Sequence, residues 1–177
     1  MPGFVDIQVH GGAGADTCDA DADGLREMAK FLLTKGVTAF CPTTMTVSNE
    51  EIAKSLETVR SCMADKEGAR IVGVNMEGPF ISPAKKGAQG DEFIQAPDFD
   101  VFKAFYDGCG GIIRLVDIAP ECDVRGDFIE KASKLCTVSV AHTATDYDGA
   151  KAAFRRGATH ATHLFNAMSG MTHRAPG

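Results

Sequence analysis

The chain has 177 residues, 44% of them hydrophobic and 24% charged, which is typical of a globular protein with one core. The formal net charge of −6, with no basic cluster beyond the pairs Lys85-Lys86 and Arg155-Arg156, argues against nucleic-acid and membrane partners. The six cysteines are dispersed and form no C-x-x-C pair, which argues against a disulfide framework. The sequence shows no apolar span and no signal-peptide pattern, so we expect a cytoplasmic location.

Predicted strands and helices alternate along the whole chain. Apolar runs predict six strands, at residues 4–9, 37–41, 71–76, 111–116, 137–141 and 158–163. Amphipathic segments with the 3.6-residue period predict the helices between them, within residues 23–36, 48–63, 98–106, 128–135 and 147–156. Uninterrupted alternation predicts parallel strands with right-handed crossovers, in either an open Rossmann-like sheet or a closed barrel.

Polar residues at helix starts support these boundaries. We expect Asp23 to cap the first helix, and Ser48 with Glu51 to form a capping box for the second. The loop of residues 77–97, which follows the third strand, is long for a compact domain. Loops of that length are typical of functional segments.

Three of the predicted strands end at residues that can bind a metal ion. Glu77 follows the third strand, His142 follows the fifth, and His163 ends the sixth. Alone, Glu77 and His142 are explained equally well as turn or strand-end residues. Three such residues in equivalent positions favour one site, because parallel strands place their carboxyl ends at the same edge of a sheet. One carboxylate and two imidazoles form a common catalytic zinc set, so we expect one divalent ion, zinc before iron, cobalt or manganese.

The residues around these positions carry a family resemblance. Glu77-Gly-Pro-Phe80, Ala141-His-Thr-Ala-Thr145 and Thr162-His-Leu-Phe-Asn-Ala-Met168, with His173-Arg174, closely resemble the N-acetylglucosamine-6-phosphate deacetylase family of the amidohydrolase superfamily. Residues 2–11 resemble the first barrel strand of that family. The resemblance spans almost the whole chain, and its motifs follow the family's order with compatible spacing.

The resemblance implies a (β/α)8 TIM barrel of the metal-dependent hydrolase type, which takes about 250 residues. Residues 1–177 hold six βα units, so we expect one domain that forms an incomplete barrel, from its first strand to its sixth. The last two units and the small β-sandwich domain of the superfamily are expected to be absent. The first and sixth strands are then exposed edges, which invite pairing with another copy.

The resemblance further implies hydrolysis of the N-acetyl group of N-acetylglucosamine 6-phosphate, giving glucosamine 6-phosphate and acetate, in a homodimer or higher homo-oligomer. It assigns phosphate binding to Arg174, across a subunit boundary, and contacts with the sugar or its phosphate to Ala88, Gln89, Asn166 and Ala167. Gln89 departs from the histidine often found there. The family's general base is an Asp on the eighth strand, so we expect no catalytic base within these residues and little activity from the chain alone.

The remaining histidines leave alternatives open. Other amidohydrolases carry His-x-His on the first strand, where this chain has Gln8 and His10, so we expect one metal ion with Gln8 at most touching its water. His10 would support a weak second site or, more simply, bond to backbone. His160 would face away from His163 on the strand, and His173 has no decisive interpretation. The alternative functions are a non-catalytic remnant that binds sugar phosphate or associates with other chains, and an amidohydrolase for another N-acyl substrate.

Overall fold

The computed structural model describes residues 2–177 and has a mixed α/β fold with two parallel sheets. The first sheet has the strand order β1-β4-β5, formed by Phe4–Val9, Val37–Pro42 and Arg70–Ile71. The second has the order β6-β7-β8-β9, formed by Val74–Met76, Ile113–Ile118, Thr137–Val140 and His160–Ala161. A short antiparallel hairpin follows β1 and consists of β2 (Gly11–Gly12) and β3 (Ala15–Asp16).

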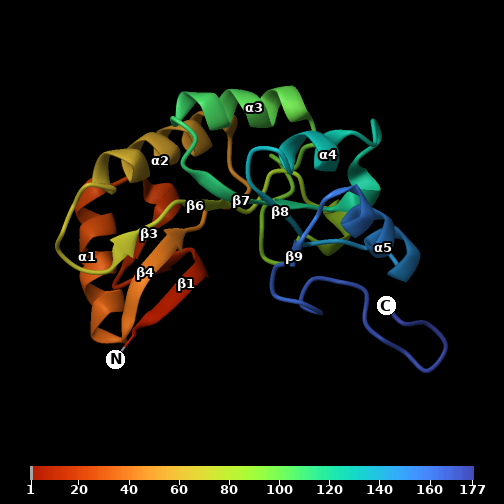
Figure 1. Cartoon of the computed structure of the whole chain (residues 1–177), viewed down its shortest axis with the longest axis horizontal. Coiled ribbons are helices and arrows are strands. Elements are labelled where there is room, and N and C mark those ends of the chain that lie inside the picture. Colours follow the sequence, from red (N-terminus) through yellow and green to blue (C-terminus); the bar gives the residue numbers. More distant parts are fainter. Residues whose placement is uncertain (1) are drawn as a thin grey trace.

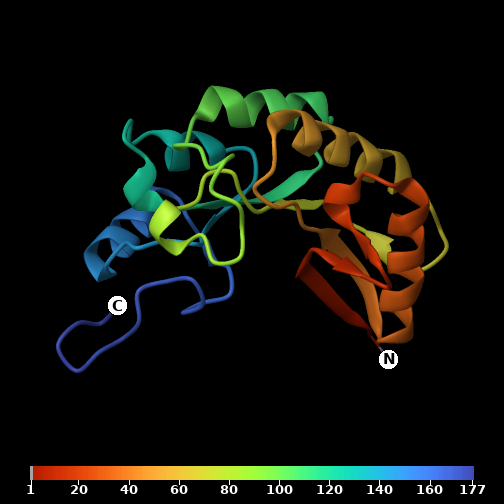
Figure 2. The same cartoon turned by 180° about the vertical axis from the view of Figure 1, so that it is seen from behind.

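Five α-helices cover one side of these strands. They are α1 (Ala22–Thr34), α2 (Asn49–Cys62), α3 (Phe99–Gly108), α4 (Phe128–Ala132) and α5 (Tyr147–Arg156). Three 3-10 helices lie in the loops, at Thr17–Asp19, Pro83–Lys85 and Pro120–Cys122. The strands form a curved layer with the helices along its outer side (Figure 1), and the view from behind shows the same open arc (Figure 2). Among the described residues the strands form no closed barrel, because β1 pairs only with β4 and β9 only with β8.

The predicted third strand is divided between the two sheets. β5 pairs with β4, whereas β6 pairs with β7, and the break includes Gly73, whose φ is +152°. A Cβ on Gly73 would lie 2.1 Å from Cγ of Arg114 and 2.9 Å from the carbonyl oxygen of Ile112, so only glycine fits this bend without movement of its neighbours. The bend corrects the single strand expected over residues 71–76 and allows one segment to join both sheets.

Two further boundaries differ from the prediction. The fourth strand begins at Ile113 instead of residue 111, because Gly110 and Gly111 have φ values of +71° and +75°, which an extended strand does not use. The last strand keeps only His160–Ala161 of the six residues expected, since the chain turns into a loop before His163.

The helix caps are partly as predicted. The side chain of Ser48 accepts the backbone N–H of Glu51, and the Glu51 carboxylate accepts the backbone N–H of Ser48, which confirms the capping box on α2. On α1, however, Asp21 is the cap in place of Asp23, because its carboxylate accepts the backbone N–H groups of Asp23 and Gly24. The helix therefore begins at Ala22, two residues earlier than a cap at Asp23 would allow.

One hydrophobic core lies between the strands and the helices. α1 and α2 bury apolar side chains at the helical period, namely Leu25, Met28, Leu32, Ile52, Leu56 and Val59. The rings of Phe102 on α3 and Phe80 both pack against Phe128 on α4, with centroid distances of 5.6 Å and 5.1 Å. Phe80 lies three residues after Glu77, so this packing anchors the start of the long loop.

Several simple features bear on the composition-based predictions. All six cysteines are free thiols, as expected. Within residues 2–177 none of the helices combines the length and the apolar character that crossing a membrane requires.

The edge strand β1 exposes apolar side chains, because Phe4 is 75% and Val5 61% accessible. An unpaired apolar edge of this kind is open to pairing.

Candidate metal centre

Glu77, His142 and His163 meet at the carboxyl ends of β6, β8 and β9. One ligand atom from each lies within 4.8 Å of the others. Nε2 of His142 is 2.9 Å from Oε1 of Glu77 and 3.1 Å from Nε2 of His163. Glu77 and His142 are buried and His163 is half-buried. Donor atoms spaced in this way can surround one ion at the bond lengths of about 2.0–2.2 Å that zinc makes to nitrogen and oxygen.

Two backbone bends turn the imidazoles toward each other. His142 has a φ of +43° and His163 a φ of +36°, a left-handed conformation that residues other than glycine rarely adopt. The two rings lie edge to face, with centroids 4.8 Å apart. Such a conformation costs on the order of 1–3 kcal/mol per residue, and it persists only where surrounding contacts enforce it. Both candidate ligand histidines are therefore held in place against local strain.

Backbone carbonyl groups fix the tautomer of both imidazoles. Nδ1 of His142 lies 2.8 Å from the carbonyl oxygen of Lys85, and Nδ1 of His163 lies 3.0 Å from that of Asn166. A carbonyl oxygen only accepts, so each Nδ1 carries the hydrogen and each neutral ring directs its Nε2 lone pair into the cluster. Two nitrogen lone pairs and a carboxylate at such short distances repel one another unless a positive charge lies between them. In the metal-free chain a proton on Nε2 of His142, donated to Oε1 of Glu77, can supply that charge, and a bound cation would replace this proton. The donor set therefore fits a divalent ion such as zinc.

The electrostatics of the cluster keep Glu77 ionised. Burial alone raises the pKa of the Glu77 carboxyl, but hydrogen bonds from His10, His142 and Gln8 outweigh burial and hold that pKa well below its usual range. Burial lowers the pKa of His142, yet the hydrogen bonds to Glu77 and to the Lys85 carbonyl raise it above its ordinary value. An ionised carboxylate beside two imidazoles attracts a cation to the centre of the group.

Side chains from β1 and from the long loop hold the Glu77 carboxylate. Gln8 donates from Nε2 to Oε2 of Glu77 at 2.7 Å. Gln89 donates from Nε2 to Oε1 at 2.7 Å, and its own Oε1 accepts the backbone N–H of Thr46 at 2.8 Å. Both amides thus bond to the carboxylate, a contact that the sequence did not reveal, and both also line the pocket above it. No local sequence pattern indicates the contacts of Gln8 and Gln89 with Glu77, because each contact joins residues that are distant in the sequence.

The remaining histidines take different places. Nδ1 of His10 lies 3.2 Å from the carbonyl oxygen of Thr43, the backbone bond that the sequence analysis favoured. Nε2 of His10 also lies 3.4 Å from Oε2 of Glu77, a contact that the sequence did not reveal. His160 is half-buried within β9, and His173 is exposed in the terminal coil.

A pocket of about 480 Å³ opens over the cluster. Its walls consist of Gln8, His10, Met45, Glu77, Gly87, Ala88, Gln89, His142, His163, Asn166 and Ala167. Four of the five residues expected to touch substrate are therefore beside the candidate metal ligands. Arg174, the fifth, is exposed in the coil after β9 and is not among the residues that line this pocket.

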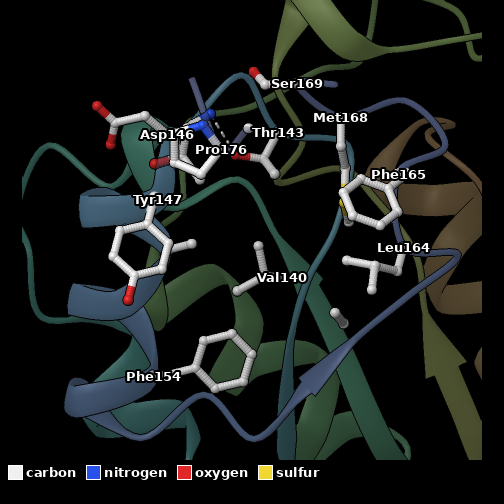
Figure 3. A pocket seen from close by; sticks show the side chains of 14 residues that line it. Val140, Thr143, Asp146, Tyr147, Phe154, Leu164, Phe165, Met168, Ser169 and Pro176 are labelled. Carbon is white, nitrogen blue, oxygen red and sulfur yellow. Dashed lines mark hydrogen bonds between the residues drawn. The ribbon is translucent and has the colours of Figure 1, made fainter. Parts of the chain in front are cut away.

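A second, apolar hollow of about 150 Å³ lies between α5 and the segment after β9. In the close view, Tyr147 and Phe154 of α5 face Leu164 and Phe165 with Val140 between them (Figure 3). None of the predicted ligand or substrate residues lines this hollow. Its apolar walls suit the packing of apolar groups and do not suit a charged sugar.

Comparison with known proteins agrees with the fold and with the motifs. A sequence model described as the Amidohydrolase family matches residues 1–175. The chain is 40% identical over 182 residues to N-acetylglucosamine-6-phosphate deacetylase of Bacillus subtilis (strain 168), which covers 100% of this chain and 46% of that protein. It is 38% identical over 182 residues to the protein of the same name from Bos taurus, covering 99% of this chain and 44% of the relative.

Solved structures give the same result. A mutant N-acetyl-D-glucosamine-6-phosphate deacetylase from Mycobacterium smegmatis, in complex with N-acetyl-D-glucosamine-6-phosphate, superposes with a TM-score of 0.89 at 31% identity, covering 99% of this chain and 46% of that one. N-acetylglucosamine-6-phosphate deacetylase from Pasteurella multocida gives a TM-score of 0.88 at 30% identity, with the same coverage. The chain spans somewhat less than half the length of these relatives. Since nearly every residue matches one family model and the relatives cover the whole chain, this chain belongs to the amidohydrolase family.

Proposed function

We propose that this chain carries the metal-binding part of a deacetylase that hydrolyses N-acetylglucosamine 6-phosphate to glucosamine 6-phosphate and acetate. The observation that carries the proposal is the close group of Glu77, His142 and His163 on one wall of a 480 Å³ pocket. Relatives named for this activity support the substrate class, because their similarity extends over the whole chain. We place the protein in the cytoplasm, where such metabolic enzymes act.

The open arc of parallel strands supports an incomplete (β/α)8 barrel. The strands lie inside the helices, and β1 and β9 each pair on one side only, as the first and last strands of an unfinished barrel would. Two more βα units would lie between these edges. The family resemblance assigns the general base to an Asp on an eighth strand, so no group among residues 2–177 is assigned to move the proton, and these residues alone are expected to release little acetate.

One divalent ion, zinc by its preference for mixed nitrogen and oxygen donors, would bind Glu77, His142 and His163. A bound ion of this kind polarises a carbonyl group and lowers the pKa of water. The chain's own contribution is to fix the ligands. The Nδ1–H groups of both histidines are held by carbonyl oxygens, and an amide, Gln8, stands beside Oε2 of Glu77 where a further imidazole would offer another metal ligand. This arrangement favours one ion per site.

The walls of the pocket suggest how an amino sugar phosphate is bound. Ala88, Asn166 and Ala167 offer backbone and amide groups beside the candidate ligands, which suits the hydroxyl and acetamido groups of a sugar. Arg174 is exposed outside its own pocket, so we propose that it reaches the phosphate in the site of a neighbouring subunit of a homo-oligomer.

Calorimetry with the purified, zinc-loaded chain tests this function. We expect binding of N-acetylglucosamine 6-phosphate to be stronger than binding of N-acetylglucosamine. Arg174→Ala should remove most of that difference, while Arg155→Ala, which removes an exposed arginine on α5, should leave it unchanged. Equal affinity for unphosphorylated N-acyl compounds would favour another amidohydrolase substrate. Sugar-phosphate binding by a chain that takes up no metal would favour a non-catalytic remnant.

A further inference from the structure

The two candidate ligand histidines share a feature that the proposed function does not use. Each is next to a threonine, Thr143 after His142 and Thr162 before His163. Both threonine hydroxyl groups are buried, and each donates a hydrogen bond to a carboxylate from the segment 117–121. That segment contains the end of β7 and the turn that follows it.

The first contact lies inside the sheet. Oγ1 of Thr162 donates to Oδ1 of Asp117 at 2.7 Å, and Oγ of Ser139 lies 2.7 Å from the same hydroxyl. Because Thr162 uses its one hydrogen on Asp117, Ser139 is the donor in the second pair. All three side chains are buried, and they join β7, β8 and the end of β9. The residue before His163 is thereby tied to the middle of the sheet.

The second contact lies on the rim. Glu121 accepts the hydroxyl hydrogen of Thr143 with one carboxylate oxygen and the backbone N–H of Ala144 with the other. The backbone N–H of Thr143 donates to the carbonyl oxygen of Ala167 at 3.1 Å. One carboxylate therefore fixes the two residues after His142, and it does so next to the loop that follows His163.

β7 lies between β6 and β8 in the sheet but supplies none of the three candidate ligands. Both candidate ligand histidines have positive φ and need contacts that hold them there. We propose that Asp117 and Glu121 are positioning residues, which act through Thr162 and Thr143 to hold His163 and His142 in the geometry that binds the metal ion. This inference rests on the proposed metal site.

Burial of Asp117 has a second consequence for the same contact. Burial, and then the charge of Glu77, raise the pKa of Asp117 to about 7, and its Oδ2 has no hydrogen-bond partner within the described part of the chain. A carboxyl group in that position is costly to keep in a core. The hydrogen bond that Oδ1 of Asp117 accepts from Thr162 is the contact that this buried carboxyl group makes. Asp117→Asn keeps the Oδ1 atom that accepts this bond.

Cobalt(II) binding by the chelator-stripped full chain tests the proposal, because it reports affinity by titration and ligand geometry by visible absorption. Thr162→Val, Thr143→Val and Glu121→Ala each remove one of the contacts, and Glu121 is exposed, so the last variant leaves the core intact. We expect each to weaken cobalt binding by about tenfold or more, as loss of a contact that orients a ligand usually does, and to change the spectrum. Thr162→Ser and Asp117→Asn, which keep the hydrogen bond, should bind cobalt as the native chain does.

Thr58→Val is the matched control, because within residues 2–177 the Thr58 hydroxyl on α2 bonds only to the carbonyl oxygen of Ala20. It should lower stability slightly and leave cobalt affinity unchanged. If Glu121→Ala and both valine variants bind cobalt within about twofold of the native chain, with an unchanged spectrum, the positioning role is wrong although the metal site stands. A native chain that binds no cobalt contradicts the proposed function itself.

Discussion

The two parallel sheets contribute to the pocket in different ways. The second sheet supplies the three candidate metal ligands, each from the end of a strand. The first sheet supplies Gln8 from β1, and its loops supply the contacts of Thr43 with His10 and of Thr46 with Gln89. One sheet therefore presents the metal-binding atoms, while the other fixes the carboxylate among them.

The carboxyl ends of parallel strands therefore serve two roles in this chain. They either present a metal-binding atom or hold the Glu77 carboxylate, according to the polar side chain at each strand end. The bend at Gly73 connects the roles, because it carries the chain from β5 in the first sheet to β6 and Glu77 in the second. The following substitutions alter one of the two sheets, the bend between them, or a helix outside both.

The largest expected effect comes from the second sheet. Glu77→Gln replaces the only carboxylate among the three candidate ligands with a poor ligand and removes a negative charge, so we expect zinc affinity to fall by at least about a hundredfold. Metal content by mass spectrometry and zinc titration measure this. Gln95→Glu, a change at a half-buried loop residue that is not in the cluster, is the control and should keep native affinity.

Asp117→Asn should show that the buried Asp117 carboxyl group in the second sheet lowers the stability of the native chain in a pH-dependent way. Burial raises the pKa of Asp117 in the folded chain to about 7, against an ordinary value of 3.8, so the folded chain binds the proton more tightly and loses stability through this group as pH rises from about 4 to 7. Asparagine does not titrate. The free energy of unfolding of the metal-free variant should therefore rise relative to that of the native chain over this pH range, by on the order of a few kcal/mol. The difference should become constant above pH 7. Urea unfolding at several pH values measures it, and a difference independent of pH would contradict this account.

Gly73→Ala tests the connection between the sheets. The new Cβ would meet Arg114 and the Ile112 carbonyl at a φ that alanine rarely adopts, so we expect a loss of about 1–3 kcal/mol in the free energy of unfolding. Gly170→Ala adds the same methyl group where nothing lies within 4 Å and should be close to neutral. Denaturant unfolding compares the two, and equal stabilities would show that the bend does not require glycine.

Gln8→Ala tests the supporting role of the first sheet. Without the Gln8 amide, Oε2 of Glu77 loses its 2.7 Å donor and the carboxylate can rotate, so zinc affinity should fall by about tenfold. Gln95→Ala removes an amide that bonds to Asn49 away from the pocket and should have no such effect. Uptake of a second ion by Gln8→Ala would show that the amide mainly excludes metal.

Ser48→Ala should have the smallest effect, because it changes the start of α2 and neither of the two sheets. It removes the capping box of α2, which should cost about 1 kcal/mol of stability. Zinc affinity should remain native, because α2 contributes no side chain to the pocket lining. Thermal unfolding and zinc titration together measure this, and a change in affinity would indicate that helix stability controls the site.

Much of this architecture could be predicted from local patterns. Apolar runs located the strands, and the residues that follow them, Glu77, His142 and His163, are brought together because parallel strands end at one edge. The split of the third strand could not be predicted, since it depends on the close approach of Arg114 to Gly73. The same holds for Gln8 and Gln89, whose contacts with Glu77 join residues 69 and 12 positions apart.

We expect Glu77, His142 and His163 to bind one divalent ion together. X-ray absorption at the zinc edge of the chain loaded with one equivalent of zinc tests it most directly, because it identifies the atoms bound to the metal. We expect two imidazole nitrogens at about 2.0–2.1 Å together with oxygen ligands, and loss of both imidazole signals in the double variant His142→Ala and His163→Ala. Sulfur ligands, an oxygen-only shell, or an unchanged spectrum in that variant would contradict it.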